Sequence, residues 1–175
     1  MKTGSKLILA LACVLAVPPA HAQAYPTRAV KLIVPFPPGG GTDYIARELA
    51  LHMGKQKNWN VVVENRPGAG GSVGLGSAAN AKPDGYTIVL GQTSNLAILP
   101  TLQPKIQYDP VSSFTPVALV AEAPLVFVGP KQATYSNAQQ FIEQVKAAPP
   151  NSMNFGIPGI GTVAHLASLL FQLKS

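Results

Sequence analysis

The strongest constraint on the fold is a short apolar run that ends in prolines and glycines. Residues 30–34 are Val-Lys-Leu-Ile-Val, a composition typical of a buried strand. Residues 35–41 follow as Pro-Phe-Pro-Pro-Gly-Gly-Gly. The prolines cannot continue a ladder, the glycines permit a sharp turn, and Thr42 or Asp43 could cap a helix. The stretch therefore predicts a buried strand, a tight turn and a helix N-terminus.

Such a turn could bind an anion, because free main-chain N–H groups gather at the positive end of a helix dipole. No Lys or Arg stands between Pro35 and Ala46, so the turn lacks the lysine of a phosphate-binding loop. A carboxylate suits it better, since a few N–H groups and a hydroxyl satisfy its charge at about 1.5–3 kcal/mol per bond. The alternative is that the glycines only allow the backbone to turn from strand to helix and bind no ligand.

The same order of elements then repeats. Helical spacing predicts helices over 42–57 and 73–81, and apolar runs predict strands over 60–65 and 86–91. Alternating strands and helices favour a parallel sheet, and ligands of such sheets bind beyond the carboxyl ends of the strands. A glycine-rich or polar loop follows each of the three strands, at that end of the predicted sheet.

From about residue 99 the pattern changes to an irregular, proline-marked crossing segment. Beyond it we expect strands over 117–121, 125–128 and 153–157, a helix over 137–148, and a last helix opened by Thr162. The turn at residues 159–162, Gly-Ile-Gly-Thr, resembles the first glycine turn in following a strand and opening a helix. Two domains that each aim a helix N-terminus at a shared cleft would hold a dicarboxylate from both ends.

The first 22 residues have the pattern of a secretory signal. Lys2 and Lys6 precede an apolar run over 7–17, and Ala20-His21-Ala22 is a small-residue cleavage site. A retained N-terminal anchor is the alternative. Cys13, the single cysteine, lies in this segment, so we expect a mature chain from about residue 23 without a disulfide, exported to a bacterial periplasm.

Charge and composition narrow the partners. The net charge of +6 is compatible with an anionic ligand. Lys and Arg do not cluster with aromatic residues, which argues against nucleic acid. No His, Cys, Asp or Glu group has metal-ligand spacing. We therefore expect neither a nucleic-acid partner nor a metal or other cofactor.

Several motifs together resemble the periplasmic receptors of tripartite tricarboxylate transporters, the Bug family. They lie at Tyr25-Pro26, residues 34–43, residues 63–71, residues 83–87 and residues 159–165, in family order. The resemblance covers residues 25–175. It implies an α/β, type II periplasmic-binding-protein fold, a Venus flytrap of two lobes. It also implies a monomer without catalytic activity that captures a small di- or tricarboxylate and delivers it to a membrane permease.

The resemblance also implies that main-chain N–H groups, hydroxyls and ordered water hold the ligand. The contacts that it assigns to the first lobe are Phe36, Gly39, Gly40, Gly41, Thr42 and Asp43, those lining the cleft are Gly70, Gly71, Thr93 and Ser94, and those of the second lobe are Gly159, Gly161 and Thr162.

The domain boundaries follow from these assignments. We expect a signal peptide over 1–22, a first α/β lobe over 23–99, and a crossing segment with a partial second α/β lobe over 100–175. Two lobes of ~100–200 residues each need more residues than remain after the signal. We therefore expect a truncated reading frame or gene fragment whose second lobe is incomplete.

Three other interpretations remain open. Residues 70–74 match the G-x-S-x-G pattern of a serine esterase, with Ser72 as nucleophile, Asp84 or Asp109 as acid and His165 as base. However, residues 66–69 separate the strand from Ser72. Residues 159–164 match a G-x-G-x-x-A dinucleotide turn. A periplasmic ligand sensor without a transport role would use the same lobes. For His165 itself, a packing role is the simpler interpretation.

Overall fold

A computed structural model describes residues 24–174; the predicted signal and Cys13 lie outside them. Three parallel strands form the sheet, in the order β2-β1-β3: β1 (Val30–Val34), β2 (Val61–Asn65) and β3 (Thr87–Val89). In register, Val30 lies opposite Val61 and Leu32 lies opposite both Val63 and Ile88. The predicted parallel sheet is therefore confirmed.

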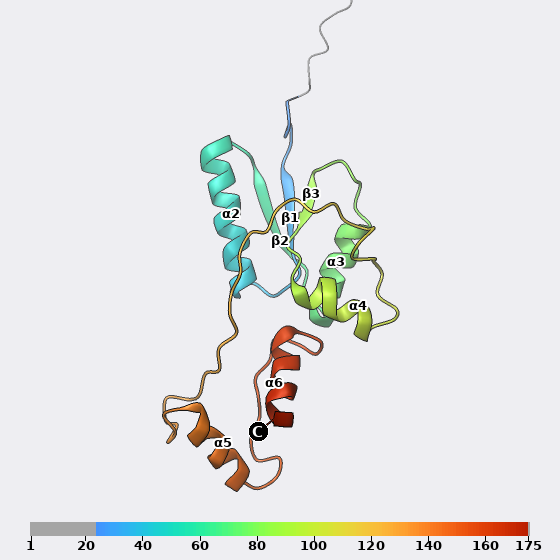
Figure 1. Ribbon diagram of the computed structural model, residues 1–175. Coiled ribbons are helices and arrows are strands. Elements are labelled where there is room, and N and C mark those ends of the chain that lie inside the picture. Colours follow the sequence, from blue (N-terminus) through green and yellow to red (C-terminus); the bar gives the residue numbers. More distant parts are fainter. Residues whose placement is uncertain (1–23, 175) are drawn as a thin grey trace, which may run out of the picture.

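Helices cover both faces of this sheet (Figure 1). Leu32 and Val34 pack in one cluster with Ala46 of α2 (Gly41–Lys57). Side chains of a strand alternate between its faces, so Ile33 points to the other side, where α3 (Ser72–Ala79) contacts β1 and β3. Burial on both faces explains why residues 30–34 are a nearly continuous apolar run.

Beyond the carboxyl ends of the strands, short helical turns follow the loops. They are η1 (Ala69–Gly71), the π-helical turn η2 (Ser94–Ile98) and α4 (Leu99–Leu102). The sequence did not predict η2 or α4, because residues 94–102 carry polar and proline signals that favour an irregular segment. The chain then runs past the sheet to α5 (Ala138–Ala147) and α6 (Val163–Lys174), which lie below that end of the sheet in Figure 1.

The strands expected over 117–121, 125–128 and 153–157 are wrong: within residues 24–174 none of these segments pairs with another strand. Their apolar, β-branched composition satisfies strand propensity, but a strand also needs a hydrogen-bonded neighbour. Residues 117–128 instead run without regular structure, with side chains as exposed as those of Val117 and Val128, both 87%. The sheet expected for the second lobe is therefore not formed among the described residues.

Four phenylalanines join this segment to the helices below it. The ring centroids of Phe127 and Phe171 lie 4.9 Å apart, and the rings of Phe141 and Phe171 stack at 5.8 Å. Phe155 completes the cluster at 5.8 Å from Phe127. Aromatic pairs at these separations stabilise packing beyond their buried area, so the four rings hold this part of the chain together, although Phe127 is 59% exposed.

Candidate functional site

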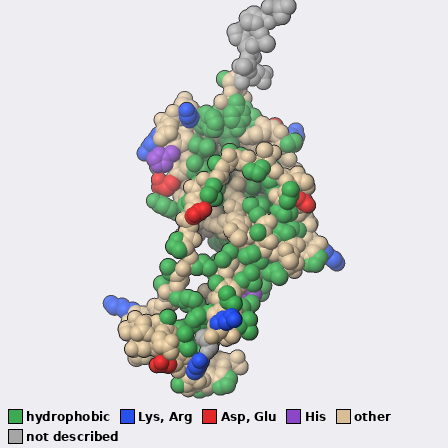
Figure 2. Space-filling model, viewed as in Figure 1, with side chains coloured by type: hydrophobic (Ala, Val, Ile, Leu, Met, Phe, Trp, Pro, Cys, Tyr) green, Lys and Arg blue, Asp and Glu red, His purple; other side chains and the backbone are tan. Residues whose placement is uncertain are grey.

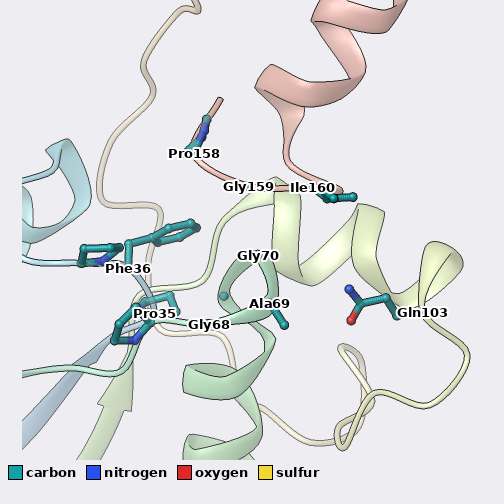
Figure 3. Close-up of a pocket in the computed structure, with 12 residues that line it drawn as sticks. Pro35, Phe36, Gly68, Ala69, Gly70, Gln103, Pro158, Gly159 and Ile160 are labelled. Atoms are coloured by element: carbon teal, nitrogen blue, oxygen red, sulfur yellow. The ribbon is translucent and has the colours of Figure 1, made fainter. Parts of the chain in front are cut away.

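A cavity of about 360 Å³ lies where β1 and β2 end, between two glycine turns that are far apart in sequence. Residues 35–37 and 67–71 form the wall on the side of the sheet, and residues 158–160 form the opposite wall, with Gln103 at one end. Figure 3 shows Phe36, Gly68 and Gly70 facing the Pro158–Gly159 turn across this space.

Glycine makes the close approach of the two turns possible. Gly70 has φ +67°, and a Cβ added to it would lie 3.1 Å from the carbonyl oxygen of Ile160 and 3.0 Å from Cδ1 of Leu99. Gly71 has φ +100°, a backbone conformation that side chains disfavour. Pro35 ends β1 because proline cannot donate to the ladder. Pro35 thus ends the strand at the edge of the cavity, and the glycines let the two turns approach each other across it.

The chemistry of the cavity comes from its main chain. Among its twelve lining residues Gln103 has the one polar side chain, and none is charged. Within the described part of the chain, the main-chain N–H groups of Gly70, Gly159 and Ile160 have no hydrogen-bond partner. Figure 2 shows scattered Lys and Arg side chains among broad hydrophobic and tan areas on this face of the molecule. A carboxylate here would be held by neutral donors.

The first glycine turn is arranged differently from the prediction. The N-cap of α2 is Gly40, without a side-chain cap bond, so the expected cap by Thr42 or Asp43 is wrong. The carboxylate of Asp43 is buried and accepts hydrogen bonds from Gly39 N at 2.9 Å, from both Nε and Nη2 of Arg47 at 2.9 Å, and from Nδ2 of Asn65 at 2.9 Å. These bonds, from Arg47 first and then from Gly39 and Asn65, hold the pKa of Asp43 well below its usual range.

Asp43 is therefore an internal anion of the first lobe. Its carboxylate accepts the Gly39 N–H that the sequence analysis assigned to a ligand, so in this structure Asp43 makes its contacts within its own lobe. The physical reason is that a carboxylate in the first turn of a helix, four residues after Gly39, can accept from the turn as readily as a ligand can. Gly40 and Gly41 remain exposed, outside the cavity lining.

The second glycine turn is also partly self-satisfied. Thr162 is buried and its hydroxyl donates to Gly159 O at 2.7 Å. His165 Nδ1 accepts from Gly161 N at 3.2 Å. Ser94 Oγ accepts from Val163 N at 3.2 Å, so a hydroxyl from the first lobe caps α6. The His165 N–H also donates to Thr162 Oγ1 at 3.3 Å. Three N–H groups around the start of α6 thus have side-chain acceptors, and His165 has structural contacts.

The loop over residues 92–95 connects the start of α2 to the start of α6. Gln92 Nε2 donates to Thr42 Oγ1 at 2.5 Å, which connects the loop to the start of α2. Asn95 is fully buried, and its Oδ1 accepts from Gln92 N at 2.8 Å. Thr93, which precedes η2, is exposed. The loop therefore supports the cavity from behind and does not line it.

The structure brings four of the predicted site residues to the cavity: Phe36, Gly70, Gly71 and Gly159. The others lie in the adjacent turns, outside the cavity lining: Gly39, Gly40, Gly41, Thr42, Asp43, Thr93, Ser94, Gly161 and Thr162. The sequence did not identify Gln103, Pro158, Ile160 or Asn95. The prolines that flank each glycine turn could have indicated Pro158, whereas Gln103 has no local signal.

The esterase arrangement is not assembled among residues 24–174. The turn η1 lies between β2 and Ser72, so Ser72 does not sit directly at a strand end. Asp84 pairs with Arg28 at 2.9 Å, and Asp109 accepts from the main chain of its own loop. His165 is held by Gly161. The described residues contain neither a cluster of three potential metal ligands nor a helix long and apolar enough to span a membrane.

Comparison with known proteins places this geometry in context. A family profile described as "Tripartite tricarboxylate transporter family receptor" matches residues 45–175. The protein BugT of Bordetella pertussis is 40% identical over 158 residues, which are 90% of this chain and 48% of BugT. The chain thus spans about half the length of the curated relatives it matches.

Solved structures give the same picture. The periplasmic binding protein BugD is 36% identical with a TM-score of 0.78, the R. palustris protein Rpa4515 with adipate is 30% identical with 0.81, and MatC from Rhodopseudomonas palustris with bound malate is 34% identical with 0.76. Each match covers 85% of this chain and 50% of the other chain. The fold is therefore the α/β fold of periplasmic binding proteins.

Proposed function

The chain belongs to the tripartite tricarboxylate transporter receptor family, and from this premise we propose that it captures a small di- or tricarboxylate in the cavity between residues 35–37, 67–71 and 158–160. The single observation that carries the proposal is that cavity, because two glycine turns face each other there with main-chain N–H groups that have no partner among residues 24–174.

Charge and size support a carboxylate as the ligand. A volume of about 360 Å³ is at the lower end of small-molecule sites. The cavity wall has no basic side chain, which disfavours a multiply charged phosphate. A hydrogen bond to a charged group is worth about 1.5–3 kcal/mol, so a few main-chain donors suffice for a carboxylate. Two structural relatives are described with adipate and malate, which are acids of this class.

The remaining parts of the proposal concern location and partners. We place the protein in the periplasm, exported by residues 1–22, with a first lobe over 23–99 and a crossing segment with part of a second lobe over 100–175. There it would deliver its ligand to a membrane permease as a monomer, without catalysing a reaction. The periplasmic location is supported by the relative BugD, which is a periplasmic binding protein. The absence of catalysis is supported by Asp84 and Asp109, which within residues 24–174 are bound to Arg28 and to the Val111 N–H and not to a histidine.

A thermal-shift screen tests the function. The chain is heated at pH 7 with mono-, di- and tricarboxylates, including malate and adipate, and with the uncharged diamide of succinate as a control. A ligand at a hundred times its Kd stabilises the fold by about 2.7 kcal/mol, or roughly 5–10 °C for a domain of this size. A rise with acids and none with the diamide is expected; no rise with any acid would contradict the proposal.

Two variants test whether the thermal shift comes from binding in the cavity. Ile160→Asp adds a negative charge at the cavity wall on a side chain that is 75% exposed, so the fold tolerates it and the affinity for acids falls. Val111→Asp, at a residue 86% exposed and outside the cavity lining, is the matched control. Equal shifts in both variants would place the ligand elsewhere.

A further inference from the structure

One buried polar group behind the cavity lacks a hydrogen-bond partner in the described part of the chain. The side chain of Asn95 is 0% exposed, and within residues 24–174 its Nδ2 makes no hydrogen bond. Buried donors in folded proteins are nearly always paired, since an unpaired one costs the free energy of its desolvation. An exception of this kind calls for a physical explanation.

The orientation of the carboxamide is fixed by its surroundings. Oδ1 of Asn95 accepts from the main-chain N–H of Gln92 at 2.8 Å. Rotating the carboxamide by 180° would direct its NH₂ group at that N–H, donor against donor. The main chain is held too, because Asn95 N donates to Gln92 O at 3.1 Å and the Tyr108 hydroxyl donates to Asn95 O. The unpaired atom is therefore Nδ2, and it is held in place.

This donor lies directly behind the cavity wall. A Cβ added to Gly71 would lie 2.6 Å from Asn95 Nδ2 and 3.4 Å from Cζ of Phe36. Gly71 and Phe36 both line the cavity. At this point a single glycine separates the fixed NH₂ group from the cavity. That glycine and its neighbour Gly70 both have positive φ. Glycine adopts positive and negative φ about equally well, so this turn can change its backbone conformation at low cost.

We propose that Asn95 is a specificity-determining residue of the cavity: its Nδ2 donates to a carboxylate oxygen of the bound acid when the Gly70–Gly71 turn moves aside. The inference rests on the proposed function and deepens it. A fixed NH₂ group offers two N–H donors and no acceptor, so it favours an ionised carboxylate over a hydroxyl or an amide NH₂ at that end of the ligand.

The variant Asn95→Asp tests this in the full chain. It keeps an oxygen for the Gln92 N–H and replaces the unpaired donor with an acceptor. We expect the Kd for malate, measured by calorimetry at pH 7, to rise by at least tenfold. Asn80→Asp is the matched control, because Asn80 is exposed and its Nδ2 donates to Gly76 O at 2.8 Å, outside the cavity lining. Its Kd should stay within twofold of wild type.

A measurement on the wild-type chain keeps the proposal falsifiable if Asn95→Asp does not fold. The side-chain ¹⁵NH₂ resonance of Asn95 is followed by NMR during a malate titration. A downfield proton shift that saturates with binding supports the proposal, as does the tenfold rise in Kd. Binding of malate with an unmoved Asn95 resonance, or with an unchanged Kd in folded Asn95→Asp, overturns this inference alone. A wild-type chain that binds no acid overturns the proposed function and this inference with it.

Discussion

The hydroxyl of Ser94 accepts a hydrogen bond from the main-chain N–H of Val163 at 3.2 Å, across 69 residues of sequence. Ser94 is buried at the start of η2, beyond the sheet, and Val163 is the first residue of α6. Side-chain oxygens at helix N-termini satisfy N–H groups that the helix itself leaves unpaired. This bond therefore fixes α6, and the glycine turn before it, against the first lobe.

Ser94→Ala should loosen α6 without unfolding the sheet. Loss of an N-terminal cap costs about 0.5–2 kcal/mol, so we expect amides in the first turn of α6 to exchange hydrogen faster by roughly two- to thirtyfold. Hydrogen exchange measured by mass spectrometry checks this. Thr93→Ala is the control, since Thr93 is exposed and makes no side-chain cap bond. Unchanged exchange in α6 would show that the Ser94 hydroxyl does not cap it.

Asp43 makes stability depend on pH. Its folded-state pKa is lowered by hydrogen bonds from Arg47, Gly39 and Asn65. Its contribution is therefore fully present above the unfolded-state pKa of about 4 and is lost as the pH falls toward the lower folded-state pKa. We expect Asp43→Asn to be less stable than wild type at pH 7, with a gap that narrows below pH 4 in urea unfolding.

Two other acids affect the same pH range and define the control. Glu64 has a lowered pKa because Lys31 and then Arg66 donate to it, and Asp109 because the Ser112 and Val111 N–H groups donate to it. The control is Asp109→Asn, which keeps Asp43. Its free energy of unfolding should still fall below pH 4 because Asp43 becomes protonated. A gap between wild type and Asp43→Asn that stays constant from pH 7 to pH 2.5 would contradict the role of the Asp43 carboxylate.

Two glycines of α3 should respond oppositely to alanine. A Cβ on Gly74 would lie 2.8 Å from Cα of Pro35 and 2.9 Å from the carbonyl oxygen of Arg66, where the backbone cannot yield. We expect Gly74→Ala to destabilise the fold by about 1–3 kcal/mol. A Cβ on Gly76 would meet Cβ of Gln107 at 3.7 Å, an ordinary contact.

The expected result for Gly76→Ala is a gain of about 0.5–1 kcal/mol, because alanine restricts the unfolded chain and favours the helix. Urea unfolding of both variants measures the difference. If Gly74→Ala were as stable as Gly76→Ala, α3 would not pack as closely against Pro35 as the structure shows.

The core of the sheet gives a fourth prediction. Leu32 is buried at the centre of β1 and packs with Ala46, so Leu32→Ala should cost about 2–5 kcal/mol through lost burial and the cavity left behind. Leu51 of α2 is 48% exposed, and Leu51→Ala should cost under about 0.5 kcal/mol. Equal losses in chemical denaturation would contradict the assignment of β1 as the central strand.

The sequence predicted the first sheet well because its signals are local. An apolar run bounded by prolines marks β1, and helical spacing marks α2. The family and the periplasmic-binding-protein fold were predicted from motifs and are confirmed by the comparisons. The order β2-β1-β3 was not predicted, because strand order depends on packing between segments.

The predictions failed where the structure depends on a second segment of the chain that the local sequence does not reveal. Residues 117–121, 125–128 and 153–157 have strand composition, yet they lack a neighbouring strand among the described residues. At the site, the glycine motifs predicted that the turn at residues 39–42 faces the turn at residues 159–162, whereas the cavity lies between residues 67–71 and residues 158–160. The motifs could not show that Asp43 would take the Gly39 N–H, because an internal carboxylate satisfies a turn as well as a ligand does.

The central claim is that main-chain groups of two glycine turns hold a carboxylate between them, and an NMR titration of the ¹⁵N-labelled chain with malate tests it most directly. The amide resonances of Gly70, Gly159 and Ile160, which line the cavity, should shift together and saturate with one binding constant. Those of Gly54 and Gly85, outside the cavity lining, should stay within error. Shifts confined to residues away from the cavity, or no saturable shift at all, would contradict the account.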